Sequence, residues 1–229
     1  IFTVGISCSK YLEKKSSNAT VTPSTLADLQ GLLDDANNVM NRGVTPILGE
    51  ASTDDYFILQ SVFDARETME QDFYMWKRTP YQFPNDWSKS YAPVFSANFC
   101  LEAINKIERT AVNAAAWDQV KGSCLFYRGY NFLNLLWSHC NAYDPATSNT
   151  DLGIVLRLSS DFNEPSQRSN VEEGYQRVIT DTKAAIPLLP VKPVHTFRPS
   201  QWAAYALLAR TYLSMRIYDS ANHYASLAL

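Results

Sequence analysis

The sequence is poor in the residues that build metal sites and disulfide frameworks. Its 229 residues include only four cysteines and three histidines. The cysteines form no Cys-x-x-Cys pair, which argues against a zinc site, and with Cys8 set aside an odd number remains. We interpret Cys100, Cys124 and Cys140 as small buried thiols, because free cysteine is among the most buried residue types. We therefore expect no metal and no cofactor.

Two other absences narrow the class of protein further. No stretch of the chain approaches the roughly 20 consecutive apolar residues that a transmembrane helix needs. The 20 Lys and Arg residues are scattered and are outnumbered by 23 Asp and Glu residues, for a net charge of −3. Since nucleic-acid binding depends on clustered positive charge, we expect no nucleic-acid partner.

The motifs of the common enzyme classes are also missing. The sequence has no nucleophile elbow, P-loop, glycine-rich dinucleotide turn or metal triad. An enzyme that cleaves glycans needs two carboxylates about 5–10 Å apart across the scissile bond. Asp54 and Asp55 are adjacent, so their side chains diverge and cannot form that pair by themselves. We expect a protein that is not an enzyme, and keep a glycan-active enzyme as the weaker alternative.

Apolar side chains are abundant and follow a helical period. They make up 46% of the chain, including 13 Tyr, 11 Phe and 5 Trp, which is enough to build a core. Their spacing predicts a mainly all-α fold with irregular loops. The expected helices cover residues 23–40, 63–74, 88–109, 115–141, 170–186 and 201–215, with a last one starting near 219. An extended piece is expected at 152–158.

Polar residues at helix starts define several of these ends. Thr22 before Pro23 is typical of a first turn, with Thr as the cap and proline at the first helical position. Ser169 with Glu172 forms a capping-box pattern. Ser200 is expected to cap the helix that follows it. Within the apolar helix 115–141, Arg128 is expected to form a buried ion pair with an acidic residue such as Asp181.

The last two helices carry the pattern of a tetratricopeptide repeat. Small residues there allow two antiparallel helices to approach closely, and larger ones fill the seam between them. One repeat cannot bury its own face, so neighbouring helix pairs are required, and 88–141 and 170–215 could supply them. The residues at the key spacing are Tyr205, Leu208, Ala209, Tyr212, Ala221, Ala225 and Ala228.

The first residues suggest an export signal. Ile1–Ser7 is a short, mostly apolar run that ends in small residues and is followed by Cys8, as at the end of a lipoprotein signal peptide. We expect residues 1–21 to comprise this signal end, a lipid-modified Cys8 and a polar tether. Residues 22–229 would form one helical domain that is incomplete at its C-terminal end. The alternative is a fragment that happens to begin with apolar residues.

Taken together, these features resemble the SusD/RagB-like lipoproteins of Bacteroidetes-type outer membranes. The resemblance runs almost end to end, although Val155 replaces a usual proline and family members are considerably longer. Its elements are Cys8 with the tether and Tyr11-Leu12-Glu13, the acidic segment 50–55, Trp87, Tyr91, Asn98 and Ile104, then Gly122, Phe126, Arg128 and Phe132, Leu152–Leu156, residues 168–175 leading to Asp181, Leu188-Leu189-Pro190, and Trp202–Leu213.

The resemblance implies a function for the chain. Such a protein is lipid-anchored and exposed at the outer-membrane surface, touches the membrane only through its anchor, and binds a nutrient, most often a glycan. It would deliver that ligand to a SusC-like TonB-dependent transporter. Binding would use aromatic rings against sugar faces and polar groups on hydroxyls, without covalent chemistry. A tetratricopeptide-type protein-interaction scaffold is the alternative class.

The best candidate for the binding site is an aromatic loop before the 88–109 helix. Trp76, Tyr81 and Phe83 could form a stacking platform, because rings on a proline-containing loop are not obviously core. Arg78, Asp54 and Asp55 could supply hydrogen bonds. The alternative is that these rings simply pack the loop onto the helices, as most large rings do. We interpret Trp87, Trp117, Trp137 and Trp202 as structural, since they lie in helical patterns.

Overall fold

The structure, a computed structural model, describes residues 23–40, 44–78, 85–193 and 195–229. The mainly all-α prediction is confirmed, because helices dominate and the strands are short. In chain order the elements are α2 (Leu26–Leu33), η1 (Ala36–Met40), α3 (Leu48–Ala51), α4 (Gln60–Asp64), α5 (Thr68–Tyr74), α6 (Asp86–Ile104), α7 (Ala114–His139), β1 (Leu152–Val155), β2 (Arg168–Asn170), α8 (Val171–Ala185), η2 (Ile186–Leu188), α9 (Gln201–Ser214) and α10 (Tyr218–Ala228).

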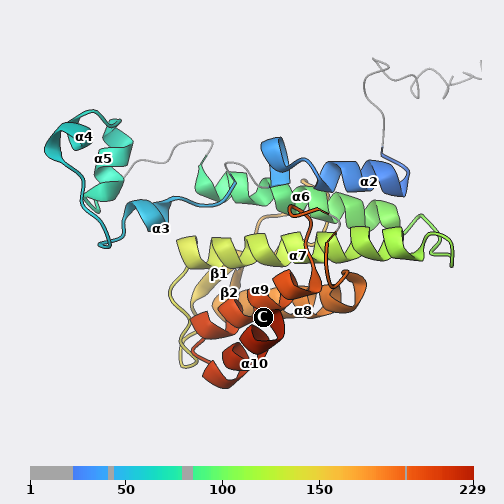
Figure 1. Ribbon diagram of the computed structural model, residues 1–229. Helices are drawn as coiled ribbons and strands as arrows, with labels where there is room; N and C mark the ends of the chain where they lie inside the picture. The colour runs from blue at the N-terminus through green and yellow to red at the C-terminus, as the bar shows by residue number, and fades with distance from the viewer. Residues whose placement is uncertain (1–22, 41–43, 79–84, 194) are drawn as a thin grey trace, which may run out of the picture.

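The long helices α6 and α7 form the centre of the fold (Figure 1). They lie side by side, with α2 packed against both on one side and α8 against α7 on the other. The chain then continues through α9, which packs against α8, and α10, which packs against α9 at the bottom of the view. Because α7 is enclosed on several sides, apolar residues occur nearly all round it, as its sequence predicts.

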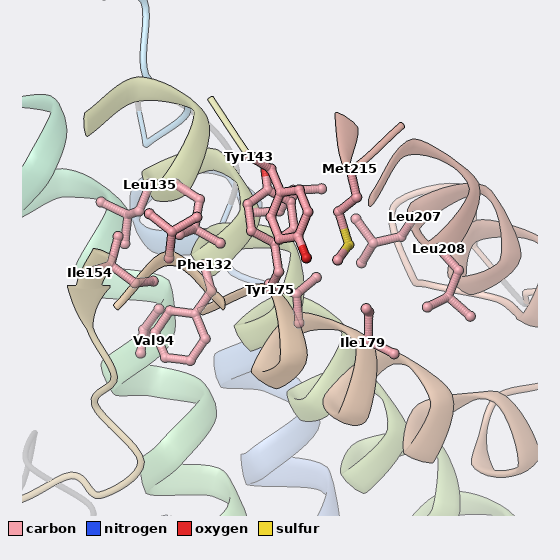
Figure 2. Close-up of a cluster of buried hydrophobic side chains, with 14 residues drawn as sticks. Val94, Phe132, Leu135, Tyr143, Ile154, Tyr175, Ile179, Leu207, Leu208 and Met215 are labelled. Carbon is pink, nitrogen blue, oxygen red and sulfur yellow. The ribbon is translucent and has the colours of Figure 1, made fainter. Parts of the chain in front are cut away.

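The core divides into two main clusters on either side of α7. The larger one joins α6, α7, β1, α8 and α9, with fully buried Phe132 near its middle (Figure 2). The second lies under α2, where Leu29 and Leu33 pack against Cys100 and Cys124. These two thiols are buried, as expected, whereas Cys140 is only partly so. Removal of this apolar surface from water stabilises the helix stack.

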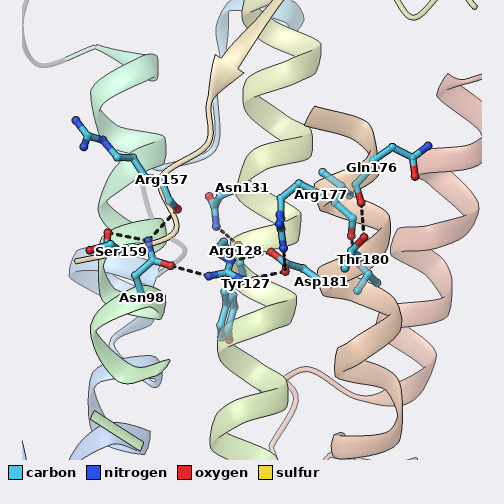
Figure 3. Close-up of polar contacts among 12 residues, drawn as sticks. Asn98, Tyr127, Arg128, Asn131, Arg157, Ser159, Gln176, Arg177, Thr180 and Asp181 are labelled. Carbon is cyan, nitrogen blue, oxygen red and sulfur yellow. Dashed lines mark hydrogen bonds and ion pairs between the residues drawn. The ribbon is translucent and has the colours of Figure 1, made fainter. Parts of the chain in front are cut away.

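A buried ion pair connects α7 to α8 (Figure 3). Arg128 donates from Nε and Nη2 to the two carboxylate oxygens of Asp181, at 2.7 and 2.8 Å, as the sequence led us to expect. Its Nη1 donates to the Asn98 side-chain oxygen on α6, at 2.9 Å. The two charged side chains are only 8% and 3% exposed. One guanidinium therefore links three helices.

Two predicted helix caps are wrong, one by three residues and the other by one. Thr25 rather than Thr22 caps the first described helix, because Asp28 completes a reciprocal capping box with it. That helix also ends at Leu33, and a π-helical turn, η1, covers part of the remaining predicted length. The cap of α8 is Asn170, paired with Glu173, instead of Ser169 with Glu172. The reason is that β2 extends through Asn170, so the helix starts at Val171 and Asn170 is the residue directly before it.

A short antiparallel ribbon lies beside α7 and α8. Only Leu152–Val155 of the expected extended piece pairs in it, with Arg168–Asn170 as the partner strand. The strands are so close that a Cβ added at Gly153 would lie 2.3 Å from the carbonyl oxygen of Asn170. Any larger residue at position 153 would clash with this carbonyl group, so glycine is required for steric reasons and not because of its backbone dihedral angles. The ribbon fixes both ends of the connection from 155 to 168.

Helices α9 and α10 form the antiparallel pair expected at the C-terminal end. Ser200 caps α9 through the backbone N–H of Ala203, as predicted. Between the helices the rings of Tyr212 and Tyr224 are stacked, with centroids 5.5 Å apart and an interplanar angle of 2°. Ala221 is buried in the same seam. The tetratricopeptide repeat itself stays a prediction.

Candidate functional site

The segment α3–α5 projects from the helical body and carries part of the predicted site. In Figure 1 it lies beyond the end of α6 and α7, away from α8–α10. The Ile47 backbone N–H at its base donates to the Asp86 carboxylate, at 2.7 Å. Neither α4 nor α5 contains a buried residue. Since residues 48–78 contain seven Asp or Glu and three Lys or Arg, the segment is acidic as well as exposed.

Aromatic contacts give this segment its internal order. The ring of Tyr74 lies 6.0 Å from that of Tyr56 and 5.9 Å from that of Phe63. The side chain of Gln71 donates to the backbone carbonyls of Phe63 and Arg66, both at 3.0 Å. The single helix expected over 63–74 is therefore two short helices, because the chain reverses between them and packs on itself.

The described residues of the predicted site are all exposed. Trp76 is 75% exposed and has a left-handed backbone, with φ of 55°. Arg78, Asp54 and Asp55 are exposed as well, whereas Tyr81 and Phe83 lie outside the described residues. The alternative, in which the ring packs the loop onto the helices, does not hold for Trp76, because its indole lies mostly in solvent.

The Tyr56–Tyr74 contact joins two parts of the projecting segment that flank predicted site residues. Asp55 directly precedes Tyr56, and Trp76 follows Tyr74 by two residues. The two tyrosine rings lie 6.0 Å apart, and we call the region around this contact the corner of the segment. The residues that flank the contact in the sequence include an exposed indole, a guanidinium and two carboxylates, groups that suit a ligand with both apolar faces and hydroxyl groups.

The structure also contains a cavity that sequence reasoning missed. Its volume is about 450 Å³, and it lies between α6 and the segment 155–166 that follows β1. Four rings and several polar groups line it. They are Trp87, Ser88, Tyr91, Val94, Phe95, Val155, Arg157, Ser159, Ser160, Asp161, Phe162 and Ser166. One signal was available, namely the unusual length of the connection from 142 to 168, which is typical of functional loops.

Trp87 has both a structural and a lining role in this cavity. Its ring contacts those of Tyr91 and His139, at centroid distances of 5.3 and 5.2 Å, and the Arg168 guanidinium lies 5.8 Å away. These contacts fix the indole, in line with the structural interpretation from the sequence. The remainder of the same side chain forms part of the cavity wall.

Three polar side chains of α6, those of Tyr91, Asn98 and Glu102, hold the cavity wall formed by the segment 155–166 in place. Tyr91 Oη donates to the Val155 carbonyl at 2.8 Å and accepts from the Val155 N–H at 3.0 Å. Burial raises the pKa of Tyr91 above its usual range, so it stays neutral and can do both. Asn98 donates from its amide nitrogen to the carbonyls of Arg157 and Ser159, at 2.9 and 3.1 Å.

Glu102, one turn further along α6, also attaches the segment 155–166 to this helix. Its carboxylate accepts from the backbone N–H of Ser160, at 2.7 Å, and from the hydroxyl of the same residue. These hydrogen bonds from Ser160 lower the pKa of Glu102, because they favour the charged form. The wall of the cavity is therefore formed before any ligand arrives.

Two further properties of the described residues are the grouping of their metal-ligating side chains and the hydropathy of their helices. Within the described ranges no group of three or more His, Cys, Asp or Glu residues is arranged to hold a metal ion. No helix in that part of the chain is long and apolar enough to cross a bilayer. The cavity between α6 and the segment 155–166 is lined by rings together with carboxylate, guanidinium and hydroxyl groups.

Comparison with known proteins agrees with this description. A model of the SusD-like family, described as "Starch-binding associating with outer membrane", matches residues 10–213. A search of curated proteins found no match.

Solved structures show the same fold at low sequence identity. A candidate sugar binding protein from Bacteroides vulgatus has a TM-score of 0.77 at 22% identity, over 91% of this chain and 47% of its own. A SusD superfamily protein from Bacteroides thetaiotaomicron has a TM-score of 0.67 at 22% identity, over 89% and 46%. A laminarin binding SusD-like protein has a TM-score of 0.54 at 20% identity, over 69% and 32%. This chain thus spans about half the length of the first structures it matches.

Proposed function

Since the chain belongs to the SusD-like family of starch-binding proteins associated with the outer membrane, we propose that it captures a glycan at the cell surface and passes it to a SusC-like TonB-dependent transporter. The capture is non-covalent, so the chain acts as a binding protein and not as an enzyme. The glycan is neutral, because the projecting segment is acidic and would repel an anionic polymer.

The proposed contact surface is the corner of the projecting segment. A single observation carries the proposal, namely that Trp76 keeps 75% of its surface exposed on a segment held clear of the helical body. Tryptophan is among the residue types most enriched where binding energy is concentrated. Trp76, Tyr81 and Phe83 supply the rings, and Arg78, Asp54 and Asp55 supply hydrogen bonds.

Replacement of Trp76 by alanine is expected to weaken glycan binding about tenfold or more, because truncation of an aromatic hot-spot residue costs about 2 kcal/mol or more and about 1.4 kcal/mol corresponds to tenfold. Retention on native gels that contain soluble starch or laminarin measures this effect, with circular dichroism as the test of folding. Trp202→Ala is the matched control, since this tryptophan is 45% exposed but lies on α9, away from the projecting segment. Equal retention of the two variants on a glycan that binds the unaltered chain would refute the proposed surface.

We propose further that Cys8 carries the lipid anchor, which lies outside the described residues. In a chain expressed with its export signal, Cys8→Ala should move the protein from the membrane pellet to the soluble fraction and abolish incorporation of labelled palmitate. Mild detergent extracts of the same membranes test the partner, since a TonB-dependent transporter should co-purify with the anchored chain. An unchanged pellet for Cys8→Ala would contradict the anchor, and extracts that lack a transporter would contradict the delivery step.

A further inference from the structure

The cavity between α6 and the segment 155–166 has no role in the site proposed above. It lies along α6 and is lined by none of the residues of the projecting segment. We propose that this α6 cavity is a second sugar subsite, which takes one neutral pyranose unit of a glycan chain. The inference rests on the proposed glycan binding and adds a second place where the chain holds its ligand.

The rings that line the cavity supply contact surface for the apolar face of a sugar. Phe95 and Phe162 lie on opposite walls, one on α6 and the other on the facing segment, and are 47% and 81% exposed. Trp87 and Tyr91 lie on the same helix and are partly buried by the core cluster. Exposed rings at the mouth of a concave site are typical of ligand binding, because water hydrates them poorly.

Polar groups at the cavity match the hydroxyls of a sugar. The Arg157 guanidinium is fixed by bonds from Nη1 to the Glu164 carbonyl and from Nη2 to the Ser166 hydroxyl, both at 2.6 Å. These bonds use two of its five N–H donors. The exposed Asp161 carboxylate lines the same cavity, and its Oδ1 accepts from the backbone and the side chain of Asn163, which leaves Oδ2 as an acceptor. A donor and an acceptor in one cavity can bond different hydroxyls of one sugar.

The balance of charge favours a neutral sugar. The lining of the cavity contains one carboxylate, that of Asp161, and one guanidinium, that of Arg157, so the lining carries no net charge. An anionic sugar, such as a uronic acid or a sulfated unit, would therefore gain no net attraction here. A purely apolar guest, such as a leucine side chain, would leave Asp161 and Arg157 without a role.

The cavity is also preformed, which lowers the entropy lost on binding. Tyr91, Asn98 and Glu102 bond backbone atoms of residues 155–160. Behind Asn98, Arg128 and Asp181 fix the orientation of its amide (Figure 3). The volume of about 450 Å³ lies within the roughly 300–1,000 Å³ range of ligand pockets.

The test is isothermal titration of the full chain with maltoheptaose and with laminarihexaose. For whichever oligosaccharide binds, Phe162→Ala and Asp161→Asn should each raise the dissociation constant fivefold or more, and Phe162→Tyr should restore it. Phe197→Ala is the matched control, because this exposed ring belongs to a different loop. Circular dichroism spectra of all variants should match that of the unaltered chain, since both phenylalanines are on the surface.

The outcomes separate this inference from the proposed function. Binding that is weakened by Trp76→Ala but unchanged by Phe162→Ala and Asp161→Asn would overturn the second subsite and leave the proposed function in place. Binding that is weakened by the cavity variants, but not by Phe197→Ala, would support the subsite whatever the effect of Trp76→Ala. Absence of binding to both oligosaccharides, and to starch and laminarin on gels, would overturn both.

Discussion

Replacement of Arg128 by alanine is expected to lower the free energy of unfolding by about 3–5 kcal/mol, the usual result of removing one partner of a buried ion pair. Asp181 would remain almost fully buried without its bidentate partner. Arg177 lies 3.5 Å from Asp181 but is partly exposed, so it compensates only in part. Asn98 would also lose the donor that orients its amide. Urea denaturation followed by circular dichroism measures the change.

Arg109→Ala is the matched control for this prediction. Arg109 binds Asp118 with the same fork geometry, at 2.8 and 2.7 Å, but its side chain is 49% exposed. Exposed pairs contribute little to stability because water screens them, so the midpoint for this variant should stay close to that of the unaltered chain. Similar midpoints for the two variants would mean that the buried network does not stabilise the fold.

Phe132→Ala is the second substitution from which we expect a large effect. Phe132 is fully buried in the larger core cluster, close to Val94 and Ile154 (Figure 2). Truncation of a buried phenylalanine leaves a cavity and costs about 3–5 kcal/mol. The expected result is a lower midpoint in thermal and urea denaturation. Because Val94 also lines the α6 cavity, the substitution should in addition change the shape of that cavity.

Phe57→Ala supplies the comparison for Phe132→Ala. The chemical change is identical, but Phe57 is 81% exposed, so almost no surface returns to water. Substitutions of this kind usually change stability by less than about 0.5 kcal/mol. If both variants unfolded at the same urea concentration, the burial assigned to Phe132 would be wrong.

The sequence predicted well what depends on helical periodicity. Helix α7 and the helix α9 behind Ser200 match their predicted ranges to within one or two residues. The ion pair between Arg128 and Asp181 was also expected, because a lone arginine in an apolar helix needs an acidic partner. Each of these conclusions follows from a strong local pattern and from the rules of burial.

The features that were missed depend on contacts between distant segments. Ser169 and Asn170 are both good caps, and the choice between them follows from the pairing of β2 with β1, which local sequence does not reveal. The break between α4 and α5 reflects the packing of Tyr74 on Phe63.

The α6 cavity was missed for a similar reason. It forms only because Tyr91 and Asn98 hold a segment about 60 residues further along the chain. Nothing in the local sequence of Phe162 or Asp161 indicates that they come to lie opposite α6.

The way in which α6 holds this segment has a consequence for the variation of specificity. Tyr91, Asn98 and Glu102 bond mainly the peptide groups of residues 155–160, which every amino acid possesses except for the N–H that proline lacks. Side chains at the mouth, such as Asp161 and Phe162, can therefore be exchanged without loss of the bonds that position the wall. A related chain could change its preferred sugar by a few substitutions there, while the frame around the ligand stays the same.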